Sequence, residues 1–127
     1  LIVTPNLNKK VVKLAVNANC HCYPGVVTPT EAFKALEYGA SGLKLFPISM
    51  LGLDGFKALK SVLPAEAKCY PVGGIDPTAQ SIYPYLDAGA FGFGLGSSLY
   101  KPSMTLDEIK NNAESFVRVY KQYSLNR

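Results

Sequence analysis

Charged residues are scarce in this sequence, and long hydrophobic runs are absent. Asp, Glu, Lys and Arg make up 17% of the 127 residues, whereas hydrophobic residues make up 48%. This balance excludes an intrinsically disordered chain and predicts one globular domain over residues 1–127. No stretch approaches the roughly 18 uninterrupted apolar residues that a membrane span needs, so we expect no membrane partner. Residues 1–5 also lack the charged leader and small-residue cleavage site of a signal peptide.

Cysteine is scarce as well. Cys20, Cys22 and Cys69 are odd in number and do not have metal-ligand spacing. We therefore expect buried, reduced thiols in a cytoplasmic protein, and no metal site. The net charge of +4 suits an anionic ligand. The lysines are scattered, however, and no basic run interleaves with aromatic residues, which argues against nucleic-acid binding.

Apolar periodicity and turn residues predict five strand–helix units in succession. The predicted strands cover residues 1–4, 20–23, 43–46, 69–72 and 91–94. The predicted helices cover residues 9–17, 29–38, 53–63, about 81–87, and a long segment from residue 106 onward. Thr28 and Thr105 each open a capping box, and Asn8 is suited to cap the first helix. Pro24-Gly25 is expected to close the second strand, and a short helix is expected after Gly96.

Short apolar strands that alternate with helices imply a parallel sheet with right-handed crossovers. Both a doubly wound sheet and a (β/α) barrel fit this order. Functional-looking residues gather at the carboxyl ends of several strands, which is where a barrel builds its active site, and this favours the barrel. Five units do not close an eight-stranded TIM barrel. We therefore expect a partial barrel, with three β-α units preceding Leu1.

Lys44 is the best candidate for a reactive group. It lies between Leu43 and Leu45 in an apolar strand, and Phe46 follows. An apolar environment favours the uncharged amine, which is the form that condenses with a ketone to give an imine. A lysine on the outer strand face that extends to solvent is the alternative interpretation. Its position near the strand end, beside two glycine turns, favours the reactive role.

Two glycine turns follow the last two predicted strands. Gly73-Gly74 allows backbone N–H groups to approach an anion closely. Gly96 and Ser97 follow the fifth strand and could hold phosphate through backbone amides and the serine hydroxyl. In barrels, phosphate often binds between the loops of the last two strands. The two turns together predict a phosphate site.

The sequence resembles the 2-dehydro-3-deoxy-phosphogluconate/phosphogalactonate aldolase family, which are class I aldolases on a (β/α)8 barrel. The matching stretches lie at residues 2–6, 24–31, 42–47, 71–75 and 92–97. The resemblance implies that Lys44 forms the Schiff base and that Gly73, Gly74, Gly96 and Ser97 bind phosphate. It also implies that Phe46 and Pro24 line the substrate site, that no cofactor is needed, and that the protein is a trimer.

Val72 bears on the substrate that this resemblance implies. Gluconate-type members of the family tend to carry Thr before the Gly-Gly pair, and galactonate-type members carry Val. We therefore expect cleavage of 2-dehydro-3-deoxy-6-phospho-D-galactonate to pyruvate and D-glyceraldehyde 3-phosphate. The two substrates are epimers at C4, where one side chain could discriminate between them. The gluconate epimer is the first alternative.

Two residues that the resemblance implies are missing from this sequence. The family's general-base glutamate and its carboxylate-binding arginine belong to strands that this sequence does not contain. A phosphosugar isomerase or synthase that forms no imine, or an inactive fragment, therefore stays open. His21 is more simply explained as a strand residue than as an acid–base group, and Tyr23 could face the barrel interior.

Overall fold

The structure is a computed structural model that describes residues 1–125. Strands and helices alternate along it. The strands are β1 (Ile2–Val3), β2 (Cys22–Tyr23), β3 (Gly25–Val26), β4 (Leu43–Leu45) and β5 (Cys69–Pro71). The helices are α1 (Lys9–Asn17), α2 (Pro29–Glu37), α3 (Ile48–Val62), α4 (Ala79–Asp87) and α5 (Leu106–Leu125). The predicted α/β class is confirmed.

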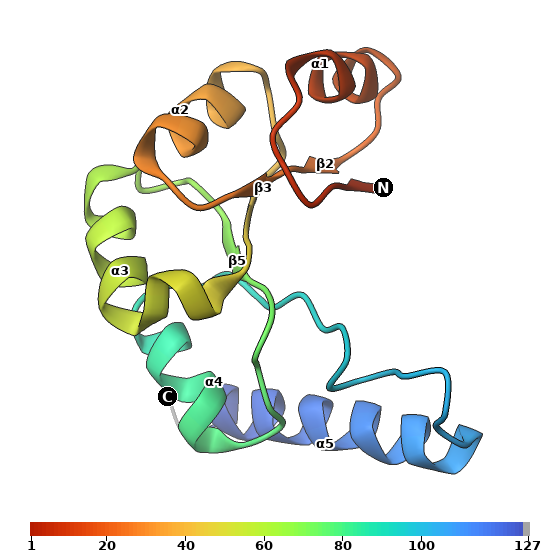
Figure 1. The fold of residues 1–127 in the computed structure, drawn as a ribbon. Coiled ribbons are helices and arrows are strands. Elements are labelled where there is room, and N and C mark those ends of the chain that lie inside the picture. The colour runs from red at the N-terminus through yellow and green to blue at the C-terminus, as the bar shows by residue number, and fades with distance from the viewer. Residues whose placement is uncertain (126–127) are drawn as a thin grey trace.

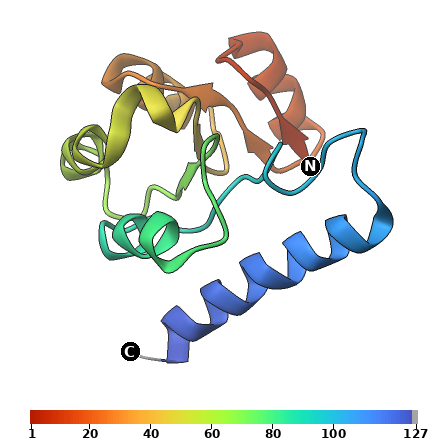
Figure 2. The same ribbon diagram turned by 60° about the horizontal axis from the view of Figure 1, so that its bottom comes forward.

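All strand pairs are parallel, as predicted. β1 pairs with β2, and β3, β4 and β5 form a second ladder in that order. A single parallel bridge joins Val72 to Gly94 beyond β5. Helices α1 to α4 follow one another around the outside of this curved row of strands (Figure 1), and α5 runs along one end of the molecule (Figure 2).

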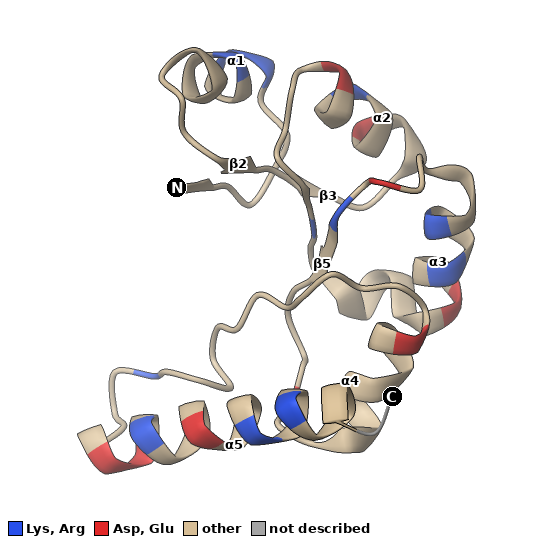
Figure 3. Ribbon diagram, turned by 180° about the vertical axis from the view of Figure 1, so that it is seen from behind, with Lys and Arg blue, Asp and Glu red and all other residues tan. Residues whose placement is uncertain are grey.

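The hydrophobic core lies between the strands and the helices. Leu43 and Leu45 of β4, Phe56 of α3 and Cys69 of β5 are completely buried there. A smaller cluster packs α1 against β2. Charged residues lie mainly on the helices, as Figure 3 shows, and few lie on the strands. Among residues 1–125, no helix is both long and apolar enough to cross a membrane.

The predicted helix caps are confirmed. Asn8 accepts hydrogen bonds from the backbone N–H groups of Lys10 and Val11, and α1 has its predicted bounds. The capping box of α2 is complete, because Glu31 Oε2 accepts from the Thr28 N–H at 3.0 Å and Thr28 Oγ1 accepts from the Glu31 N–H at 3.3 Å. The Thr105–Glu108 capping box also forms, at 2.7 and 3.2 Å.

Two predicted helix starts were wrong. α3 begins at Ile48 rather than near residue 53, and Gly52 interrupts it with a φ of 64°. This positive φ suits glycine, and it lets an extra helical turn precede the main helix. α4 begins at Ala79 rather than near Ser81, because Thr78 caps it by accepting from the Ser81 N–H. Pro84 therefore lies inside α4 and not in its first turn.

The predicted strand ends also need correction. Pro24 does not end the second strand, because the chain continues as β3 and exchanges its neighbour β1 for β4. Residues 91–94 run beside β5 through hydrogen bonds from Phe91 N to Cys69 O and from Gly94 N to Pro71 O, yet only Gly94 forms a β-bridge. The segment after Gly96 is a turn and not a short helix.

The buried thiols match the expectation from sequence in part. Cys22 and Cys69 are free and buried, whereas Cys20 is free and half-buried. Burial raises the pKa of the Cys22 and Cys69 thiols, which keeps both in the protonated form. Residues 1–125 contain no group of three His, Cys, Asp or Glu side chains that could hold a metal ion.

A glycine-to-alanine change at Gly25 should be destabilising. A Cβ atom added there would overlap the backbone carbonyl of Pro5, which cannot move independently of its chain. We expect Gly25→Ala to lower the free energy of unfolding by about 1–3 kcal/mol, measured by urea denaturation. Gly96→Ala is the matched control, because an added Cβ there meets nothing within 4 Å. Equal stabilities of the two variants would contradict this packing.

Glu31 should make stability depend on pH. Hydrogen bonds from the Val27 and Thr28 N–H groups hold the pKa of its carboxyl below the usual value. This stabilisation is present above the unfolded pKa of about 4.3 and is lost as pH falls through the lower folded pKa. Glu31→Gln should therefore destabilise the protein more at pH 7 than at pH 3. Exposed Glu37→Gln serves as the control and should show no such difference.

Candidate active site

Lys44 is positioned by the alternation of side chains along β4. Leu43 and Leu45 are completely buried against the helices, so the residue between them points to the opposite face of the sheet. Lys44 lies in register with Gly25 on one side and Tyr70 on the other. The interpretation of Lys44 as an outer-face lysine is therefore wrong.

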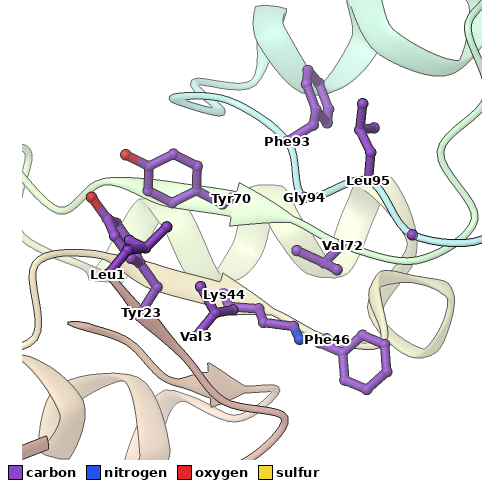
Figure 4. A pocket seen from close by; sticks show the side chains of 11 residues that line it. Leu1, Val3, Tyr23, Lys44, Phe46, Tyr70, Val72, Phe93, Gly94 and Leu95 are labelled. Carbon is purple, nitrogen blue, oxygen red and sulfur yellow. The ribbon is translucent and has the colours of Figure 1, made fainter. Parts of the chain in front are cut away.

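The Lys44 side chain enters a hollow of about 600 Å³ that is mostly apolar. The hollow is lined by Leu1, Val3, Tyr23, Lys44, Phe46, Tyr70, Val72, Phe93, Gly94, Leu95 and Gly96. Figure 4 shows the amine directed toward Phe46, and its Nζ lies 4.5 Å from the centroid of that ring. Within residues 1–125, the amine makes no hydrogen bond or ion pair. It is thus available to a ligand.

Two tyrosines close the hollow on the side away from Phe46 (Figure 4). The rings of Tyr23 and Tyr70 meet edge to face with centroids 5.2 Å apart, and Tyr70 meets Phe91 at 5.7 Å. A Cβ at Gly42 would lie 2.8 Å from the Tyr70 ring, so glycine makes room for the pair. Burial raises the pKa of Tyr70, which therefore stays a neutral phenol. Tyr23, considered from sequence as a residue of a barrel interior, lines this hollow.

A second hollow of about 300 Å³ adjoins the first. Both are lined by Phe46, Val72, Gly94 and Gly96, which form their common wall. The second hollow is also lined by Gly73, Gly74, Ile75, Asp76, Ser97, Ser98 and Lys101. The structure therefore brings together all four residues of the predicted phosphate site. Asp76, Ser98 and Lys101 were not selected from sequence.

Backbone geometry makes this second hollow suitable for an anion. Gly73 and Gly74 both have positive φ, 92° and 74°, a backbone conformation that recurs in anion-binding turns. The N–H groups of Gly73, Gly74, Ser97 and Ser98 donate no hydrogen bond to any other group of residues 1–125. Free amides on two facing turns can therefore donate to phosphate oxygens.

Two residues singled out from sequence lie outside both hollows. Pro24 is buried in the sheet, where its carbonyl accepts the Lys44 N–H at 3.1 Å, so it supports the lysine backbone. His21 is exposed and does not line either hollow. No Asp or Glu of residues 1–125 lines the larger hollow.

The chain was compared with known proteins. The family description "Aldolase: KDPG and KHG aldolase" matches residues 1–115. The chain is 43% identical over 122 residues to the 2-dehydro-3-deoxy-6-phosphogalactonate aldolase of Escherichia coli (strain K12), covering 96% of this chain and 58% of the relative. It is 42% identical to the probable enzyme of the same name from Rhizobium meliloti (strain 1021), covering 94% and 56%.

A solved structure agrees with these relatives. The structure described as "Native KDPGal structure" superposes with a TM-score of 0.93 and 41% identity, covering 98% of this chain and 59% of that one. The chain thus spans a little over half the length of the relatives it matches. The match nevertheless runs through nearly all of this sequence, including both hollows, and on this evidence the chain belongs to the KDPG and KHG aldolase family.

Proposed function

We propose that the chain is the part of an aldolase barrel that carries the imine-forming lysine and the phosphate site. On this proposal, residues 1–127 form one domain with three preceding β-α units, and supply the fourth to eighth units of a (β/α)8 barrel. Two observations support it. The strands pair in parallel and in chain order, β1 with β2, then β3, β4 and β5, and the matched relatives are longer than this chain.

The proposed reaction is cleavage of 2-dehydro-3-deoxy-6-phospho-D-galactonate to pyruvate and D-glyceraldehyde 3-phosphate. One observation carries the proposal: the unpaired Lys44 amine lies in an apolar hollow that adjoins a hollow lined by free backbone amides. A ligand that spans both would need a carbonyl at one end and an anion at the other. A phosphorylated 2-keto acid has this arrangement.

Lys44 would act as the nucleophile. Its amine adds to the C2 ketone, and loss of water gives an iminium. A base removes the C4 hydroxyl proton, the C3–C4 bond breaks, and its electrons pass into the iminium to give an enamine while the aldehyde leaves. Protonation at C3 and hydrolysis then release pyruvate and the free amine. The iminium is the electron sink, so the reaction requires neither a metal nor an organic cofactor.

The base and the carboxylate anchor would come from the preceding units. The resemblance implies a glutamate and an arginine there, and the absence of a carboxylate among the described lining residues of the larger hollow agrees with that division. Tyr23 and Tyr70 carry the hydroxyl groups at the end of the larger hollow that lies away from Phe46. Burial raises the pKa of Tyr70, so this side chain stays a neutral phenol and would not replace a carboxylate base.

Val72 is proposed to select the substrate epimer. It lines both hollows, between Lys44 and the glycine turn, and so would lie beside the middle of a spanning ligand. An added Cβ at Gly94 would overlap the Val72 side chain, so this glycine lets Val72 stand in the common wall. An apolar side chain there gives no hydrogen bond to a C4 hydroxyl, which supports the galactonate over the gluconate epimer.

The remaining expectations belong to the same proposal. A phosphosugar enzyme that forms no imine would use the glycine hollow but not Lys44, and it is the second candidate because the two hollows have separate polar groups.

The buried free thiols of Cys22 and Cys69 support a cytoplasmic location. A trimer is proposed by resemblance to the family.

Replacing Lys44 should abolish imine formation. Borohydride reduction with pyruvate should add mass at Lys44 in the whole protein, and Lys44→Ala should trap nothing and lose at least about 10³-fold in kcat. Lys57→Ala, an exposed lysine on α3, is the matched control and should trap normally. Trapped mass at another lysine would refute the assignment. Phosphate binding without any trapping would favour the second candidate.

Val72→Thr should shift the epimer preference. The change adds a hydroxyl at nearly constant volume, so we expect kcat/KM for the gluconate epimer to rise by about two- to tenfold relative to the galactonate epimer. The measurement is retro-aldol cleavage of both epimers. Val72→Ala controls for side-chain size and should not produce this shift. An unchanged ratio in Val72→Thr would remove Val72 as the discriminator.

A further inference from the structure

Lys101 is a basic residue in the wall of the glycine hollow. Of the residues that line this hollow, only Lys101 and Asp76 carry a charge. Lys101 lies 28 positions after Gly73 in the sequence, and the fold brings both to one hollow. Lys101 makes no ion pair within residues 1–125, where the single ion pair joins Lys110 to Glu114. Its charge is therefore not committed to a partner of this chain.

The loop that carries Lys101 is held in place at both ends. The N–H groups of Leu99 and Tyr100 donate to Gly96 O at 2.9 and 3.0 Å, and the Met104 N–H donates to Lys101 O at 3.0 Å. Asn112 on α5 donates from Nδ2 to Leu99 O at 3.4 Å. The loop is thus tied to the last helix, so Lys101 is presented on a defined backbone.

We propose that Lys101 binds the phosphate group of the ligand, supplying the positive charge that the backbone amides of Gly73, Gly74, Ser97 and Ser98 lack. This rests on the proposed function, since it assumes a phosphorylated ligand in the glycine hollow. Neutral amides fix the positions of phosphate oxygens, and a lysine ammonium adds the attraction of a point charge.

Asp76 is the other charged residue of this hollow, and its negative charge opposes the binding of an anion. A carboxylate close to a bound phosphate dianion would repel it. The Asp76 N–H donates to Ser81 Oγ at 3.0 Å, so its backbone is fixed at the start of the segment that leads into α4. With Lys101 on the wall as well, the two charges offset each other. Because Lys101 offsets the charge of Asp76, the free amides can favour an anion in this hollow.

The test is Lys101→Met in the whole protein. Lys101 is exposed, so we expect a moderate rise in KM for the phosphorylated substrate, about five- to tenfold, with little change in kcat. Inorganic phosphate, followed by ³¹P NMR titration, should bind more weakly by a similar factor. Lys101→Arg should restore most of both values. Lys110→Met, on the exposed side of α5, is the control and should leave both unchanged.

Borohydride trapping with pyruvate separates this inference from the proposed function. Pyruvate carries no phosphate, so its trapping at Lys44 should be equal in wild type and Lys101→Met. If wild type fails to trap, the aldolase proposal fails, while the phosphate titration still tests Lys101. An unchanged phosphate affinity in Lys101→Met, or weaker pyruvate trapping alongside the raised KM, would overturn the role of Lys101.

Discussion

The site depends on the alternation of side chains along the three residues of β4. Leu43 and Leu45 are anchored in the core on one face, which forces Lys44 to the other face. The core fixes the register of β4 with β3 and β5, because a slip by one residue would exchange the faces. Burial of two leucines is therefore what holds an amine in an apolar hollow.

The ends of elements with local signals could be predicted from sequence. Asn8 and Thr28 accept hydrogen bonds from residues two or three positions away, so their capping depends on the nearby sequence alone. Pro24 was expected to close the second strand, but its carbonyl accepts the Lys44 N–H and the chain stays extended, so the missing proline N–H does not end the pairing. The start of α4 was predicted too late, near Ser81, because proline is disfavoured inside a helix, whereas Thr78 makes the capping bond and Pro84 lies within α4.

In the candidate site too, residues with a distinctive local sequence could be predicted, whereas a residue placed only by the fold could not. Lys44 and the two glycine turns have distinctive neighbours in sequence, and the fold places them in adjoining hollows. Lys101 has no such signal, because an exposed lysine in a polar loop resembles any surface lysine. The folded loop, bonded to Gly96 O and to Asn112 of α5, brings Lys101 to the hollow that Gly73 and Gly74 line. The positive charge at the proposed phosphate site therefore comes from tertiary structure and not from a local sequence signal.

The hydrogen bond from Asn112 to Leu99 O makes the two faces of α5 unequal in their tolerance of substitutions. The face of α5 that carries Asn112 and buried Phe116 is coupled to the loop that lines the glycine hollow. No residue of α5 lines either hollow, so substitutions on this face would act on a bound ligand from a distance. The face that carries the exposed Lys110–Glu114 pair has no such coupling. Sequence drift on α5 should therefore be uneven, slow on the inner face and fast on the outer one.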